Sequence, residues 1–357
     1  MKNVADLIEV TQVAQSRISE VDFNHLIFGA VYTDHMFVMD YKDGVWQTPK
    51  IIPYQAFSYE PSAKVFHYGQ AIFEGMKAYK FIETGDVYLF RPEKNIRRMN
   101  LSAERLAMPQ IPEDIFLSAL KKLVDLDSSW VPEGFGKALY IRPVFIATEN
   151  QISAAPSTDY RFMIILSPAD KYYSGDVKVK IETRYSRACN GGIGYAKAAG
   201  NYAAQFMPTN KALEEGYQQI IWTDSCNHKY LEEAGTMNMF FRLGDNLVTA
   251  PTGDRILNGV TRDSIITLAK DHGINVEVRP IEVKEVVEGA KSGHLKEIFG
   301  TGTAATVLPI VGLGYEGEYY ALPRLDNAYA NVLKEMLMNI QYGIAPDPYG
   351  WMVPVKK

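Results

Sequence analysis

The amino-acid sequence predicts a mixed α/β protein of the α+β kind, folded as two domains. Its 357 residues exceed what a single domain usually contains. Strand-like and helix-like patterns alternate along the chain, and a run of turn-forming residues interrupts them near the middle. We therefore predict a smaller N-terminal domain over residues 1–168, a linker over 169–176 and a larger C-terminal domain over 177–357.

The N-terminal domain is predicted to be rich in strands. Apolar and β-branched residues recur there in short runs, with Asp43-Gly44 as a hairpin turn. The expected strands cover residues 26–31, 35–41, 46–52, 78–82, 87–90, 138–147 and 160–166. Ile96, Met99 and Ala103 recur at helical spacing, and a second helix is expected after Pro112.

The C-terminal domain is predicted to alternate strands with helices. Strands are expected at residues 177–183, 219–223, 237–242 and 247–250, and helices at 203–215, 261–272 and 325–340. The small residues Asn258-Gly259-Val260 before the middle helix leave backbone amides that suit an anion such as phosphate. Residues 298–306, rich in glycine and threonine, form a second candidate for anion binding.

Composition excludes several classes of protein. Hydrophobic residues make up 47% of the chain and charged residues 22%, a balance typical of folded globular proteins. The net charge of −5 and the lack of a basic run argue against a nucleic-acid partner. Cys189 and Cys226 form no metal-binding or disulfide pattern, and no apolar run approaches the ~20 residues of a membrane span. We expect a cytoplasmic protein that acts on small molecules, without a metal and without membrane contact.

One lysine stands out as a candidate for chemistry. Lys197 lies among the glycines and alanines of residues 191–202, which let a ligand approach the backbone closely. A lysine amine in such surroundings can form a Schiff base with a carbonyl substrate or with pyridoxal phosphate. The alternative is a flexible glycine loop with a surface lysine, and this stretch alone does not decide between the two.

The other candidate sites favour pyridoxal phosphate over a nucleotide. The sequence has no GxxxxGK[ST] motif and no GxGxxG motif that joins a predicted strand directly to a predicted helix, so a nucleotide-binding kinase or dehydrogenase is disfavoured. Pyridoxal phosphate needs a lysine, donors for its phosphate and an acid that keeps its ring nitrogen protonated. Glu233, in a predicted loop before an apolar strand, is the candidate acid, and a solvated turn with two acids is the alternative.

Several blocks in order resemble one known family. The chain resembles the branched-chain amino acid aminotransferases of the fold-type IV pyridoxal phosphate enzymes, from Phe28 to Trp351. The matching segments are Tyr32-Thr33-Asp34-His35-Met36, Ile72-Phe73-Glu74-Gly75-Met76-Lys77-Ala78, Leu89-Phe90-Arg91-Pro92, Leu139-Tyr140-Ile141-Arg142-Pro143, residues 191–202, Glu233-Ala234-Gly235-Thr236-Met237-Asn238, Asn258-Gly259-Val260-Thr261-Arg262 and residues 300–304. The resemblance implies a two-domain fold with the cofactor in the interdomain cleft, a cofactor-binding C-terminal domain, and a homodimer.

The resemblance also implies a role for each candidate cofactor residue. Lys197 would bind pyridoxal 5'-phosphate as an aldimine and then move the proton as acid and base. Glu233 would keep the ring nitrogen protonated, and Tyr202 would bond the phenolate oxygen; the alternative for Tyr202 is a core aromatic. The phosphate would be bound by Arg98, which follows Arg97 in a doublet, and by Val260, Thr261 and Thr303, with Thr236 also in the cofactor site.

The substrate pocket implied by the resemblance combines aromatic and cationic groups. It must accept an apolar branched side chain in one half-reaction and the acidic side chain of glutamate in the other. Arg142 would bind the glutamate side chain. The aromatic wall would consist of Phe28, Tyr68, Phe73, Tyr140 and Tyr172, and Thr236, Ala304 and Ala305 would bind the α-carboxylate. Core positions for the aromatics and a surface ion pair for Arg142 are the alternatives.

The function implied is transamination. The amino group would move between L-leucine, L-isoleucine or L-valine and 2-oxoglutarate by a ping-pong route, giving branched 2-oxo acids and L-glutamate. A D-amino acid aminotransferase or an aminodeoxychorismate lyase of the same superfamily is the alternative. The preference among the three amino acids stays open, since a methylene in an apolar pocket is worth only ~1–3 kcal/mol.

Overall fold

The computed structural model describes residues 7–170 and 175–356, which divide into two compact units. Within the described residues, the first unit contains 7–170, 196–199 and 339–356, and the second contains 175–195 and 200–338. Residues 171–174 of the predicted linker lie outside the described residues. The prediction of one continuous C-terminal domain over 177–357 differs from this division, because two of its stretches belong to the first unit.

The first unit is built on one large sheet. Its strands are β1 (Glu9–Val10), β2 (His35–Lys42), β3 (Val45–Trp46), β4 (Lys50–Pro53), β5 (Ala71–Phe73), β6 (Met76–Lys80), β7 (Val87–Phe90), β8 (Ala138–Ala147), β9 (Tyr160–Ala169) and β21 (Met352–Pro354). The order across the described sheet is β1-β4-β2-β9-β8-β6-β7-β21, with β3 paired to β2 and β5 to β8. The central pair β8–β9 is antiparallel along its full length, from Ala138 opposite Ala169 to Ala147 opposite Tyr160.

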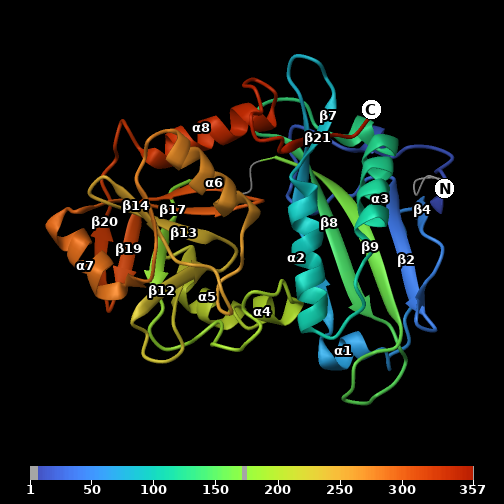
Figure 1. The fold of residues 1–357 in the computed structure, drawn as a ribbon, viewed down its shortest axis with the longest axis horizontal. Coiled ribbons are helices and arrows are strands. Elements are labelled where there is room, and N and C mark those ends of the chain that lie inside the picture. Colours follow the sequence, from blue (N-terminus) through green and yellow to red (C-terminus); the bar gives the residue numbers. More distant parts are fainter. Residues whose placement is uncertain (1–6, 171–174, 357) are drawn as a thin grey trace. The chain divides into compact units, whose positions relative to one another are not determined.

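Two long helices cover one face of this sheet. They are α2 (Pro92–Arg105) and α3 (Glu113–Leu126), which run alongside β8 and β9 in Figure 1. Pro92 suits the first turn of α2, and two acids open α3 where the helix dipole favours them. The apolar stripe of α2, Ile96 and Met99, packs with that of α3 and with sheet residues such as Phe162 in one core. A short helix, α1 (Lys64–Tyr68), precedes β5.

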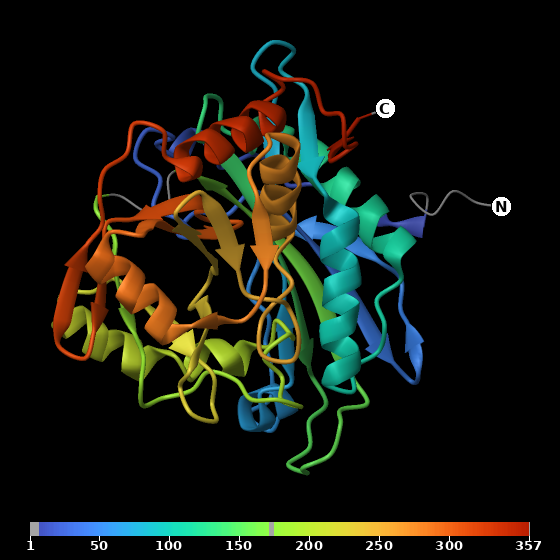
Figure 2. The same cartoon turned by 60° about the vertical axis from the view of Figure 1, so that its left-hand side comes forward.

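The second unit contains two smaller sheets, which come forward in Figure 2. One has the order β16-β12-β11-β10-β19-β20, and the other β15-β14-β13-β17-β18. Their bounds are β10 (Lys178–Ile181), β11 (Gln219–Thr223), β12 (Tyr230–Ala234), β13 (Asn238–Leu243), β14 (Asn246–Thr249), β15 (Val276–Val278), β16 (Ile281–Glu282), β17 (Leu295–Gly302), β18 (Thr306–Ile310), β19 (Gly312–Tyr315) and β20 (Glu318–Ala321). The helices are α5 (Phe206–Glu214), α6 (Val260–Asp271) and α7 (Val283–Ser292), while α4 (Ala199–Ala203) and α8 (Tyr329–Gln341) begin in one unit and end in the other.

Three expected elements differ from the structure for identifiable reasons. Residues 26–31 form turns rather than a strand, because Gly29 is left-handed (φ 71°) and the N–H of Ala30 bonds the carbonyl of Ile27. Ala169, the first residue of the predicted linker over 169–176, is instead the last residue of β9. The helix expected over 203–215 is α5, which begins only at Phe206, after the turn that ends α4 at Ala203.

The last residues return to the first unit. Strand β21 pairs antiparallel with β7, and the ring of Trp351 packs against that of Phe90 at 5.8 Å. The guanidinium carbon of Arg91 lies 4.9 Å from the centre of the same indole. The segment that follows α8 therefore completes the first sheet next to the start of α2. Within the described residues, no helix is both long and apolar enough to cross a membrane.

Candidate functional site

The backbone of Lys197 is fixed on both sides within the first unit. Its N–H donates to the Oγ of Ser102 at 2.9 Å, and its carbonyl accepts the N–H of Phe73 at 3.1 Å. The next residue, Ala198, forms a β-bridge with Ile72. These contacts describe a held backbone rather than a flexible glycine loop. The Nζ of Lys197 lies 4.8 Å from the centre of the Phe73 ring.

A buried ion pair lies in the same unit. The Nε and Nη2 of Arg98 each donate to one oxygen of Glu74, both at 2.7 Å. Asn95 adds a third bond to this carboxylate at 2.8 Å, and Glu74 is fully buried. Burial by itself would raise the pKa of Glu74, but the charge and hydrogen bonds of Arg98, helped by the charge of Lys197, lower it below its usual value. Glu74 therefore stays an anion that orients Arg98.

The arginine doublet is resolved by burial. Arg98 is 7% exposed and faces Glu74, whereas Arg97 is exposed and its Nε lies 3.9 Å from Glu113. Arg98 is thus the member of the doublet that points inward. Its binding of phosphate stays a prediction, and the structure adds that Glu74 already orients its guanidinium.

Several residues predicted to form the substrate wall meet in the first unit. The rings of Phe28 and Tyr140 lie edge to face at 4.8 Å. The Nη2 of Arg142 donates to the Tyr140 hydroxyl at 2.9 Å, and its guanidinium carbon lies 4.7 Å from the centre of the Phe73 ring. This aromatic-cationic cluster, Phe28, Phe73, Tyr140 and Arg142, shares Phe73 with Lys197. It combines apolar surface with one fixed cation, as a pocket for two kinds of side chain requires.

The absence of a side chain at Gly75 leaves the space that the Tyr140 hydroxyl of this cluster occupies. A Cβ at position 75 would lie 2.2 Å from the hydroxyl oxygen of Tyr140. We expect Gly75→Ala to displace Tyr140 and to raise KM for leucine, the amino donor that the family resemblance implies, roughly 10-fold, since a pocket contact is worth ~1–3 kcal/mol. Steady-state kinetics check this, with Gly253→Ala as the control because nothing lies within 4 Å of its Cβ position. An unchanged KM in Gly75→Ala would contradict it.

Two residues predicted for the aromatic wall, Tyr68 and Tyr172, are not among the described members of the aromatic-cationic cluster. Tyr68 ends α1 with 43% of its surface exposed, and its ring packs against that of His67. Tyr172 lies outside the described residues. Their roles in substrate binding stay predictions.

In the second unit, Glu233 is a buried and strongly bonded carboxylate. It lies on strand β12, not in a loop as predicted, because β12 pairs with β11 and β16. Its Oε1 lies 3.1 Å from the Nη2 of Arg187, and its Oε2 accepts from the side chain of Asn238 and the N–H of Leu257 at 3.1 and 3.0 Å. Three donors therefore fix the direction of its oxygens.

Asn238 connects the predicted anion sites of the second unit. Its Nδ2 also donates to the carbonyl of Leu257, and its Oδ1 would be 2.0 Å from a Cβ at Gly259, the residue before α6. The Oγ1 of Thr301, near the end of β17, donates to its carbonyl at 3.4 Å. The start of α6 thus lies beside Glu233 because residue 259 is glycine.

The remaining predicted residues of the second unit lie at turns and helix starts. Thr236 is exposed in the turn from β12 to β13, and a Cβ at Gly302 would meet its carbonyl oxygen at 2.9 Å. The partly exposed members are Tyr202 on α4 and, in the turn from β17 to β18, Thr303, Ala304 and Ala305. Val260 and Thr261 are buried in the first turn of α6. The structure therefore brings Thr236 next to the glycine-rich turn.

Glu232, adjacent to Glu233, is a second buried acid. It is 2% exposed and pairs with the Nε of Arg255 at 2.9 Å. Burial raises the pKa of Glu232 to about 7, against the opposing charges of Arg255 and Arg187. Glu232 thus titrates near neutrality, next to Glu233 on β12.

The raised pKa of Glu232 gives a pH-dependent stability. Because the folded state keeps a proton that the unfolded state releases near pH 4.5, stability falls as pH rises from about 4.5 to about 7. We expect Glu232→Gln to remove up to about 1.4 kcal/mol per pH unit of this fall. Urea unfolding across that range measures it, and equal pH slopes for the two proteins would contradict the prediction.

Four residues of these clusters were not predicted from the sequence. Glu74 and Asn238 belong to blocks that carry the family resemblance, which is the signal that could have identified them. Ser102 and Arg187 act through contacts with Lys197 and Glu233 that no local pattern indicates.

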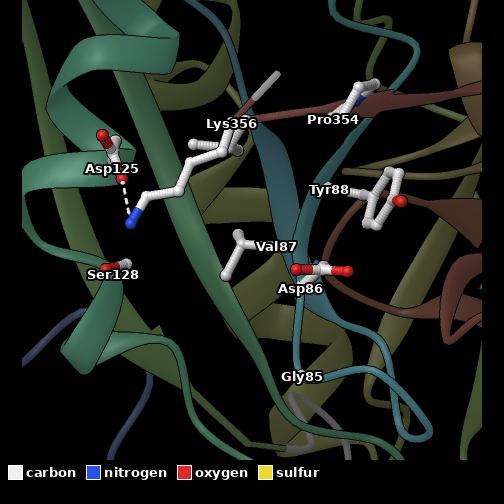
Figure 3. A pocket seen from close by; sticks show the side chains of 9 residues that line it. Gly85, Asp86, Val87, Tyr88, Asp125, Ser128, Pro354 and Lys356 are labelled. Atoms are coloured by element: carbon white, nitrogen blue, oxygen red, sulfur yellow. Dashed lines mark ion pairs between the residues drawn. The ribbon is translucent and has the colours of Figure 1, made fainter.

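A separate cavity of about 500 Å³ lies in the first unit away from the predicted site residues. Its lining includes Asp86, Tyr88 and Ser128 together with the end of the chain. Figure 3 shows Lys356 extended toward Asp125, with 3.0 Å between the charged atoms. Both side chains are substantially exposed, so this cavity offers a solvated ion pair rather than a catalytic group.

Comparison with known proteins assigns the family. Residues 71–313 match the family described as Amino-transferase class IV. Branched-chain-amino-acid transaminase 1 of Bacillus subtilis is 45% identical over 342 residues, covering 94% of this chain and 95% of that protein. The branched-chain-amino-acid aminotransferase of Mycolicibacterium smegmatis is 42% identical over 335 residues, covering 91% of each.

Solved structures confirm the predicted α+β, two-domain fold of fold-type IV. The branched-chain aminotransferase of Thermoproteus uzoniensis, with norvaline, has a TM-score of 0.73 at 25% identity, covering 90% of this chain and 99% of that one. The Escherichia coli branched-chain amino acid aminotransferase also has a TM-score of 0.73, at 22% identity and the same coverage. On the sequence match and the shared fold, the chain belongs to the class IV amino-transferase family.

Proposed function

We propose that the protein transfers the amino group between L-leucine, L-isoleucine or L-valine and 2-oxoglutarate, using pyridoxal 5'-phosphate. Relatives named for branched-chain amino acid transamination match more than 90% of the chain at 42–45% identity. The observation that carries the proposal is the fixed Lys197 beside the aromatic-cationic cluster. The cluster supplies the apolar and cationic surface that the two half-reactions need.

The residues present fit the proposed cofactor. The cofactor supplies a carbonyl that takes up the amino group and a ring that accepts electrons. A solved structure similar to this chain, a branched-chain amino acid aminotransferase with pyridoxamine 5'-phosphate, has a TM-score of 0.69 at 24% identity. Here the chain offers an amine at Lys197 and, at Glu233, a buried carboxylate that three donors orient. The first backbone amides of α6, which begins directly after Gly259, have no partner within the helix and can donate to an anion.

Each predicted cofactor residue has a distinct task in this proposal. Lys197 would hold the cofactor through its Nζ, which would also accept and return the proton of the substrate's α-carbon. Glu233 would keep a proton on the ring nitrogen, and Tyr202 would donate to the phenolate oxygen. The phosphate would be bound by Arg98, Thr303 and the amides of Val260 and Thr261, which lie in the first turn of α6.

The substrate tasks fall to the aromatic-cationic cluster and to the turns of the second unit. Phe28, Phe73 and Tyr140 exclude water from an aliphatic side chain, while Arg142 binds the side-chain carboxylate of glutamate. Thr236, Ala304 and Ala305 bind the α-carboxylate that both substrates share. These residues together supply the side-chain and α-carboxylate contacts that both half-reactions need.

The proposal includes a cytoplasmic homodimer. Large apolar side chains are exposed around α1, with Phe66 62% exposed, Tyr68 43% and Ile152 70%. Such surface on a folded unit favours a covering partner, and a second copy is the partner we propose. Light scattering during size-exclusion chromatography tests it: a mass near twice 40.1 kDa supports the dimer and a mass near 40.1 kDa contradicts it.

The substrate assignment is tested by comparing amino donors. We expect formation of L-glutamate from 2-oxoglutarate with L-leucine, L-isoleucine and L-valine, and at least about 100-fold lower kcat/KM with D-alanine, since the pocket is built for an apolar L-side chain. Turnover with D-alanine but not L-leucine would favour the D-amino acid aminotransferase alternative. Cofactor binding without turnover of any amino acid would instead indicate a non-catalytic binding protein.

A further inference from the structure

We propose that Ser102 is a positioning residue for Lys197, which sets the place from which the lysine amine acts. The inference rests on the proposed function, because it concerns the reactivity of the lysine assigned there. Ser102 is not among the residues predicted to bind cofactor or substrate, and it acts through the backbone of Lys197.

The hydroxyl of Ser102 makes two hydrogen bonds, one as an acceptor and one as a donor. Its Oγ accepts the N–H of Lys197 at 2.9 Å and donates to the carbonyl of Arg98 at 3.1 Å. Because a hydroxyl carries a single proton, the bond to Arg98 directs a lone pair toward the lysine amide. The side chain is fully buried, so water cannot replace either bond without entering the core.

The helix that carries Ser102 is itself fixed in rotation. Arg98 and Ser102 are one turn apart on α2, and therefore lie on the same face. The two bonds from Arg98 to the fully buried Glu74 prevent this face from turning. Ser102 thus connects a rigid helix to the lysine backbone, while Phe73 holds the opposite side of the same residue.

A fixed backbone matters for this residue more than for most. The lysine side chain has four rotatable bonds, so the position of its amine depends on where its Cα is held. Displacing a reacting group by about 1 Å can cost up to ~100-fold in rate. Loss of the Ser102 bond should therefore affect the lysine amine more than it affects substrate binding.

The test compares Ser102→Ala with Ser102→Thr, which keeps the hydroxyl, and with Ser292→Ala. Ser292 donates to a carbonyl one turn earlier in its helix, as Ser102 does, but lies on α7. We expect Ser102→Ala to lower kcat about 10-fold with KM for leucine nearly unchanged. It should also shift the pH midpoint of the bound cofactor's visible absorbance. Ser102→Thr should restore both values, and Ser292→Ala should match the unaltered protein.

A second readout does not depend on the cofactor. In the cofactor-free protein, hydrogen exchange followed by mass spectrometry should show faster exchange of the Lys197 amide in Ser102→Ala. If Ser102→Ala does not fold, Ser102→Cys carries the same test, because sulfur is a weak acceptor. Unchanged exchange would overturn the inference. So would a kcat per bound cofactor equal to that of the unaltered protein. Failure of the proposed function shows separately, as an absence of transamination in the unaltered protein.

Discussion

Lys197→Ala should lower transamination by at least about 1000-fold, because it removes the amine that we propose both holds the cofactor and moves the proton. The bonds to Ser102 and Phe73 are made by the backbone of this lysine and not by its amine, so they survive the substitution. The variant should therefore fold normally. Transamination kinetics and the visible absorbance of bound pyridoxal phosphate are the measurements, and both signals should be lost.

Lys211→Ala is the matched control for this variant. The Nζ of Lys211 lies 5.3 Å from the ring centre of Tyr185, so the pair repeats the lysine-aromatic contact of Lys197 with Phe73. Lys211 is exposed on α5 and is not one of the residues predicted to bind cofactor or substrate. Its loss should leave the activity unchanged. Normal turnover by Lys197→Ala, with the cofactor absorbance retained, would refute the assignment of the catalytic lysine.

The sequence was informative where a local pattern reflects a local cause. Strands β7, β8 and β11 match their predicted bounds, and the apolar spacing of α2 and α3 located both helices. Lys197 was selected as a candidate because its small neighbours are unusual around a charged residue, and its catalytic role stays a prediction. Solved structures and the family match then confirmed the fold that these patterns indicated.

Tertiary pairing accounts for what the sequence did not reveal. Two adjacent acids suggested a loop around Glu233, since isolated carboxylates are costly to bury. The cost is offset by Arg187 and Arg255, which are distant in sequence and cannot be assigned to this strand from its own pattern. The return of β21 to β7 is equally non-local, because it depends on a strand edge formed by residues far earlier in the chain.

The buried pair of Glu74 and Arg98 should make Glu74→Gln the most destabilising of the substitutions considered. The amide leaves the guanidinium buried without its counter-charge, which typically costs about 3–5 kcal/mol. The free energy of unfolding from urea titration at pH 7 measures it. Since the pKa of Glu74 is lowered in the folded protein, its stabilisation is present above the unfolded value of 4.5 and is lost as pH falls through the folded pKa. The loss caused by Glu74→Gln should therefore shrink in acid.

Asp40→Asn separates the effect of burial from that of geometry. Arg161 donates from Nε and Nη2 to the two oxygens of Asp40 at 2.6 and 2.9 Å, the same two-bond arrangement as in the Glu74 pair. The side chains of this second pair are 21% and 24% exposed, so water can solvate the guanidinium that has lost its partner. We therefore expect the free energy of unfolding to fall by only about 1 kcal/mol. Equal costs for the two variants would show that burial does not dominate. If Glu74→Gln lowers the free energy of unfolding much more than Asp40→Asn does, the buried guanidinium of Arg98 requires the negative charge of Glu74. The same carboxylate then both compensates and orients the guanidinium that is predicted to bind phosphate.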